Sequence, residues 1–359
     1  MKNHIQGLAP DDVGVPSPFA GVLRGSVSRR RRLRIASALV VGVVAVIFLA
    51  LLSLAVGSKD LGLNEVWTGL LAADGSRESI IIWQLRMPRT ALAIIVGAAL
   101  AVAGVLMQAL TRNPLAEPGL LGVNAGAAFS VVLALSVFGA TTIDEYLWFA
   151  FLGAGAAACF VYVISARRSL ASDHARLVLA GAALTASLGA CTAIITMFDA
   201  DTFNSYRFWV IGSVADRGID TALYILPFVA VGLIAAFVSG PSLNALALGD
   251  EQAKALGVRL SLVRVIAMST ITLLCGAATA AVGPIAFVGL VVPHLLRLIV
   301  GVDQRTLLVT SAVAGPVLVL AADIVGRIIQ RPGELEVGIV TAFVGAPALI
   351  VILLRGRTR

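Results

Sequence analysis

The chain has 359 residues, of which 59% are hydrophobic and only 13% are charged, and its mean hydropathy is +0.97. Soluble domains carry about 25% charged residues, so these values exclude a soluble globular enzyme and allow roughly ten membrane helices of about 20 residues each. The net charge of +7 does not indicate nucleic-acid binding, because the arginines lie beside apolar segments. The three cysteines, Cys159, Cys191 and Cys275, all lie inside apolar segments, which argues against a disulfide framework or a spaced metal site.

Residues 1–28 are polar and rich in proline and glycine, and we expect them to form a disordered cytoplasmic tail. A run of arginines at 29–34 follows, and then an uncharged segment at 35–56. A secretory signal also begins with basic residues, but its apolar core has only about 7–15 residues. We therefore expect a retained first membrane helix whose basic end lies in the cytoplasm.

Further apolar segments follow, and none alternates in polarity as the strands of a membrane barrel do. The segment at 283–300 is interrupted by Pro284 and Pro293, so we expect a short or kinked helix there. We predict an all-α membrane protein in which ten transmembrane helices form one domain over 29–359. The predicted spans are 35–56, 90–110, 118–138, 146–166, 177–198, 221–238, 265–282, 283–300, 306–322 and 337–354.

An even number of crossings that starts from a cytoplasmic N-terminus also leaves the C-terminus in the cytoplasm. In this topology, 19 of the 27 lysines and arginines lie on the cytoplasmic side. Such a bias orients helices in the bacterial inner membrane. Counting 283–300 as no crossing would put the arginine-rich C-terminal tail outside, against that bias.

A weak internal similarity relates two parts of the chain. The small residues at 97–104 resemble those at 276–283, and a Gly-Val pair recurs at 122–123 and 301–302 with the same offset of 179 residues. The two stretches fall in spans that run in opposite directions, as in inverted-repeat transporters. Such matches also arise by chance in a chain rich in alanine and glycine, so both interpretations stay open.

The sequence carries no recognisable catalytic motif. It lacks the G-x-x-x-x-G-K-[ST] loop that binds ATP phosphates, and no serine, threonine or cysteine has a histidine or aspartate partner at a readable spacing, which disfavours an intramembrane enzyme. An ion-coupled secondary transporter would need charged groups at mid-membrane depth. The carboxylates near the predicted spans fall at their edges or in loops, so we expect energy from another protein. They are Glu117, Asp250, Asp303, Asp323, Glu334 and Glu336.

The cytoplasmic loop at 241–264 has the pattern of two short helices around a glycine break. Ala253 and Leu256 would give an apolar face, and Asp250, Glu251 and Lys254 a polar one. Such an element can bind in a groove of a soluble partner, although a plain solvated loop has the same pattern. The candidate contact residues are Leu248, Gly249, Asp250, Glu251, Ala253, Lys254, Leu256 and Gly257.

Several motifs occur in order along the chain. They include Gln-Leu-Arg-Met-Pro-Arg at 84–89, Asn-Pro-Leu-Ala-Glu-Pro at 113–118 and Gly-Pro-Ile-Ala-Phe-Val-Gly at 283–289. Further ones are Ala-Asp-Ile-Val-Gly-Arg at 322–327 and the glycine-rich 338–347. Together they resemble the FecCD-type permease family of bacterial ATP-binding-cassette (ABC) importers for iron chelates and vitamin B12.

This resemblance implies a permease domain of type II ABC importer architecture. It implies that the chain is not an enzyme and binds no cofactor or metal, because ATP and Mg belong to two partner ATPase subunits. The other expected partners are a second permease, identical or paralogous, a periplasmic or lipid-anchored substrate-binding protein, and membrane lipid. The loop at 241–264 lies where this family places its coupling helices.

The resemblance also assigns roles to three arginines and suggests the cargo. Arg86, Arg89 and Arg327 match positions where the family offers positive charge to acidic residues of the binding protein. Anchoring in lipid headgroups is the alternative role for such side chains. The expected cargo is a ferric siderophore, with cobalamin and haem as alternatives.

Overall fold

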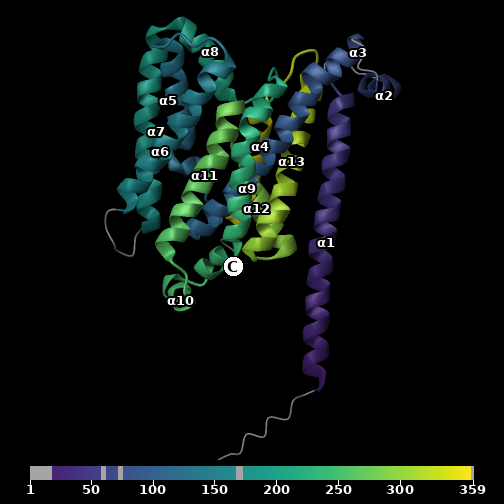
Figure 1. Ribbon diagram of the computed structural model, residues 1–359, viewed down its shortest axis with the longest axis vertical. Coiled ribbons are helices and arrows are strands. Elements are labelled where there is room, and N and C mark those ends of the chain that lie inside the picture. Colours follow the sequence, from purple (N-terminus) through teal and green to yellow (C-terminus); the bar gives the residue numbers. More distant parts are fainter. Residues whose placement is uncertain (1–17, 58–61, 72–75, 167–172, 357–359) are drawn as a thin grey trace, which may run out of the picture.

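The computed structural model describes residues 18–57, 62–71, 76–166 and 173–356, and these ranges form helices and no β-strand (Figure 1). The prediction of an all-α membrane protein is confirmed. In chain order the helical elements are α1 (Pro18–Ala55), α2 (Leu63–Leu71), α3 (Arg77–Ile80), the π-helical turn η1 (Ile81–Arg86), α4 (Met87–Thr111), the 3-10 turn η2 (Pro118–Leu121), α5 (Val123–Ser136), α6 (Ile143–Ala166), α7 (Asp173–Phe198), α8 (Ala200–Ile211), α9 (Ile219–Ala247), α10 (Asp250–Ala255), α11 (Leu260–Val282), α12 (Val288–Val300), α13 (Gln304–Ile329) and α14 (Val337–Gly356).

Seven helical segments in the described ranges are long and apolar enough to cross a membrane. Three shorter apolar helices accompany them, and these are α5, α12 and α14. Each of the ten predicted spans therefore corresponds to an apolar helix. Length and composition qualify seven of them as full spans.

The short helices α5 and α12 each follow a long helix and an irregular connection, which before α5 contains the 3-10 turn η2. Gly283 ends α11 with a φ of 77°, and Pro284 cannot donate a backbone hydrogen bond, so the chain runs without helix until Val288. The predicted span at 283–300 thus consists of a non-helical segment at 283–287 followed by the short helix α12. The order of one long and one short helix occurs twice, while the inverted repeat itself stays a prediction.

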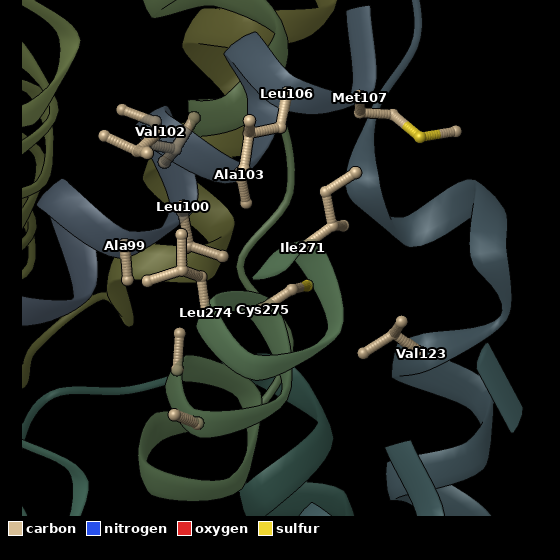
Figure 2. Packing of buried hydrophobic residues seen from close by; sticks show 14 of the residues in the cluster. Ala99, Leu100, Val102, Ala103, Leu106, Met107, Val123, Ile271, Leu274 and Cys275 are labelled. Atoms are coloured by element: carbon tan, nitrogen blue, oxygen red, sulfur yellow. The ribbon is translucent and has the colours of Figure 1, made fainter. Parts of the chain in front are cut away.

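The core is centred on α4, which packs against α9, α11, α12 and α13. Figure 2 shows Ala99, Leu100 and Leu106 of α4 near Ile271 and Leu274 of α11. Small residues allow this packing, because backbones can approach closely only where side chains are small. Cys275 lies buried in the same cluster, whereas Cys159 and Cys191 are exposed on the bundle surface.

The bundle has two distinct ends. Helices α2, α3 and α8 lie at one end, and α10 lies at the other together with the start of α1 and the end of α14 (Figure 1). We call these the α8 end and the α10 end. The start of α1 and the end of α14 lie at the same end, which agrees with an even number of crossings, while the orientation relative to the cell stays a prediction.

The predicted boundary of the N-terminal tail differs from the structure. Helix α1 begins at Pro18, so 18–28 continue the membrane helix at the α10 end, and 1–17 lie outside the described residues. Proline suits the first turn of a helix, and the arginines that follow are good helix formers. The helix therefore extends well beyond the apolar segment from which it was predicted.

Candidate functional site

The three arginines predicted to dock a binding protein converge at the α8 end. Arg86 ends η1, Arg89 lies in the first turn of α4, and Arg327 lies in the last turn of α13. They are not exposed charges: Arg327 is 1% exposed, Arg86 is 6% exposed and the side chain of Arg89 is 11% exposed. This degree of burial rules out anchoring in lipid headgroups.

Asp323 is the carboxylate that joins two of these arginines. Arg89 donates to both of its oxygens, at 2.7 Å from Nη2 to Oδ1 and 3.2 Å from Nε to Oδ2, and Arg327 donates to Oδ2 at 2.7 Å. Arg89 also pairs with Glu334 at 2.5 Å. The prediction that Asp323 lies at a span edge is wrong, because α13 continues to Ile329 and the Asp323 side chain is only 1% exposed. A buried charge of this kind is tolerated because it is paired and hydrogen-bonded.

Arg86 and Arg327 also cap the end of α1. The last four carbonyls of a helix have no partner within it. Arg327 donates to the carbonyls of Ser53 at 2.9 Å and Val56 at 2.7 Å. Arg86 donates to those of Leu54 at 2.5 Å and Ala55 at 2.8 Å. The two guanidinium groups thus lie at the negative end of the α1 helix dipole, where positive charge is favourable, and their hydrogen bonds link α1 to the bundle.

A cation-rich cavity of about 820 Å³ opens beside this cluster. Arg77 and Arg217 line it in addition to the three predicted arginines, and the sequence predicted no role for either of them. Position in the sequence gives no signal for them, because Arg77 begins α3 and Arg217 lies in the α8–α9 connection, far apart along the chain. The acidic residues on its wall are Asp216, Glu334 and Glu336.

The predicted coupling segment lies at the α10 end. Leu248 and Leu256, which flank α10, are 59% and 65% exposed, and Glu251 and Lys254 are exposed as well. Ala253 is fully buried, so the predicted apolar face of Ala253 and Leu256 is wrong: one side chain faces the bundle and the other faces away.

The glycines on either side of α10 make that break. Gly249 has a φ of 114° and Gly257 a φ of 80°, conformations that residues with a Cβ rarely adopt. Residues 241–247 belong to the end of α9, so α10 is the one separate short helix in the segment rather than one of two.

Asp250 faces two arginines that sequence reasoning did not select. Arg112 donates to its Oδ1, and Arg264 donates to its Oδ2 at 2.7 Å. Burial opposes ionisation of Asp250, but the hydrogen bond from Arg112 and the charge of Arg264 outweigh it, so the pKa of Asp250 lies below its usual value. Arg112 and Asp250 are 138 residues apart, and a single sequence carries no signal for such a pair.

The two irregular connections meet in the interior. The Phe287 backbone N–H donates to the Glu117 carboxylate at 2.7 Å, and Gln108 of α4 donates to the Gly289 carbonyl at 3.2 Å. The Glu117 carboxylate thus binds Phe287, the left-handed N-cap residue that precedes α12. Across the described ranges, no group of three His, Cys, Asp or Glu side chains could hold a metal ion.

The apolar helices define a multi-pass membrane protein. Comparison with known proteins makes the class specific, since residues 45–355 match the FecCD transport family. The chain belongs to that family, and it is a transmembrane permease subunit of an ABC importer.

The alignments with individual relatives cover most of the chain. The ferric enterobactin transport system permease protein FepD of Escherichia coli strain K12 is 42% identical, over 94% of this chain and 99% of its own. The vitamin B12 import system permease protein BtuC of Vibrio cholerae is 39% identical, over 81% and 88%. A solved structure of a metal-chelate-type ABC transporter in an inward-facing conformation is 27% identical and covers 89% of this chain and 99% of its own, with a TM-score of 0.78.

Proposed function

We propose that this permease imports a ferric siderophore across the bacterial inner membrane, with both termini in the cytoplasm. The similarity to FepD carries this proposal, because it extends over nearly the whole of both chains. Cobalamin and haem are the alternative cargoes, and BtuC supports the first of them. The chain makes no covalent bond: alternating access at a path between two permeases moves the cargo.

Uptake in a deletion strain tests the cargo. Labelled ferric siderophores, cobalamin and haem are supplied to cells that carry the chain with or without its ATPase. We expect accumulation of a ferric siderophore only when both are present. Accumulation of cobalamin or haem alone would contradict the assignment.

At the α10 end, we propose that two ATPase subunits, which carry ATP and Mg, bind the segment around α10. Two exposed leucines on a short helix between glycine breaks support this, because they suit insertion into an apolar groove. Replacing Leu248 and Leu256 with serine should abolish binding of the ATPase subunits in pull-down and leave the fold intact. Val302, 76% exposed in the α12–α13 connection, gives the matched control V302S. Equal binding by both variants would contradict the proposal.

At the α8 end, we propose that the substrate-binding protein docks over the cation-rich cavity, with Arg86, Arg89 and Arg327 as its positive floor. The convergence of these arginines on one cavity with Arg77 and Arg217 supports this. Charges at such a site mainly set docking orientation and association rate.

Charge reversal of the buried arginines would test folding rather than docking, so the test uses the cavity rim. Arg77→Gln with Arg217→Gln should slow association of the binding protein, and the wild-type association rate should fall as salt shortens the Debye length below about 10 Å. An association rate that responds to neither change would contradict electrostatic docking.

A further inference from the structure

Helix α10 is fastened to the bundle by more than chain continuity. Its first residue, Asp250, accepts from Arg112 at the end of α4 and from Arg264 in the second turn of α11. Its inner face is closed by Ala253, which is fully buried. Arg112 also donates from Nε to the Leu246 carbonyl at 3.2 Å, which ties the end of α9 to the same point. The ends of α4, α10 and α11 therefore meet at the Asp250 carboxylate, and Arg112 links α9 to them.

Helix α4 connects this point with the opposite end of the molecule. Its 25 residues span about 37 Å at 1.5 Å per residue. Arg86 and Arg89 lie at its beginning, within the cation-rich cavity, and Arg112 follows its last residue. The candidate span that contains α4 is the most deeply buried one, so α4 is enclosed by packed neighbours, and we expect it to move together with them.

We propose that Asp250 is a positioning residue that fastens α10 to α4 through Arg112 and to α11 through Arg264. Displacement of α10 by an ATPase subunit is then passed to two core helices rather than absorbed by the glycine breaks at Gly249 and Gly257. Docking at the α8 end acts on the same α4, so events at the two ends bias each other. This inference rests on the proposed coupling role of α10.

The geometry explains why a charged side chain is needed. Asp250 offers one oxygen to each guanidinium, so its two links point to different helices. An asparagine keeps the shape of the side chain, but its NH₂ group would face one of the two arginines and break that link. Glutamate restores both the charge and the two acceptors on a longer stem.

The test uses the complete transporter in vesicles, with ATP hydrolysis and cargo uptake measured together. In Asp250→Asn the ATPase subunits should still bind, while uptake per ATP hydrolysed falls about 5-fold or more. Asp250→Glu should recover most of the loss. Arg264→Gln removes the ion pair with α11 and keeps the ion pair with Arg112, so it should give an intermediate uptake per ATP hydrolysed. This variant replaces Asp250→Asn in the test if Asp250→Asn does not assemble with its partners.

Asp144→Asn is the control, because Asp144 is an exposed carboxylate at the α8 end outside both sites. It should leave uptake per ATP unchanged. Wild-type protein that fails to bind ATPase subunits would overturn the proposed coupling role itself. Wild-type binding with unchanged uptake per ATP in Asp250→Asn and Arg264→Gln would overturn only the positioning role. Loss of ATPase binding in a folded Asp250→Asn chain would also overturn it, since Asp250 would then be a contact residue.

Discussion

Asp323 sets the stability of the α8 end. It is 1% exposed and forms ion pairs with two of the three predicted docking arginines. Removal of its charge would therefore leave both arginines without this carboxylate partner. Removing one partner of a buried ion pair is strongly destabilising, whereas an exposed pair contributes little. Arg89 and Arg327 therefore stabilise the fold of the permease itself, whether or not a partner is bound.

Replacing Asp323 with asparagine should destabilise the fold by about 3–5 kcal/mol. Thermal unfolding in detergent measures this, with Asp144→Asn as the exposed control, which should change stability within about 0.5 kcal/mol. Equal unfolding midpoints for the two variants would contradict the buried network.

Asp250 leads to a prediction about pH. Its folded pKa is lowered, so its charged links to Arg112 and Arg264 are complete above the ordinary carboxylate pKa of about 3.9 and are lost as the pH falls through the folded value. Amide exchange of 250–255, corrected for intrinsic rates, should show constant protection between about pH 5 and 8. Protection that disappears within this window would contradict the assignment.

At the scale of the helices, hydropathy located all ten apolar segments and the C-terminal ends of α6, α7, α11 and α12, but it misplaced several other boundaries. Segment 306–322 was predicted to stop before Asp323, whereas α13 runs on to Ile329. Asp323 and Arg327 neutralise each other one turn apart, and a hydropathy reading treats them as two polar residues that end a span. Pairs such as Arg112 with Asp250 join distant segments, so only the folded chain reveals them.

The close approach of α4 and α12 depends on glycine. A Cβ on Gly104 would lie 1.9 Å from the Gly289 carbonyl oxygen, whereas a Cβ on Gly155 meets nothing within 4 Å. Gly104→Ala should therefore destabilise the bundle by about 1–3 kcal/mol, as overpacking does. Gly155→Ala should be neutral or stabilising by up to about 1 kcal/mol, because alanine is the better helix former. Thermal unfolding of the pair checks this, and a stable Gly104→Ala chain would refute the contact.

At the scale of the whole molecule, the buried helix α4 runs from one charged end to the other. The described part of the chain offers a cation-rich cavity at the α8 end and an exposed short helix at the α10 end. Its buried charges at the α8 end are already paired with each other, as a structural network requires. We therefore expect the protein to convert motion supplied at its α10 end into opening of a path, and to supply no energy of its own.

Reconstitution in vesicles tests this expectation most directly. The permease, its ATPase subunits and the binding protein are assembled together, and cargo entry is followed with either ATP or an imposed proton or sodium gradient. We predict entry with ATP, and none with a gradient alone. Entry driven by the gradient through the permease without ATPase subunits would contradict the account.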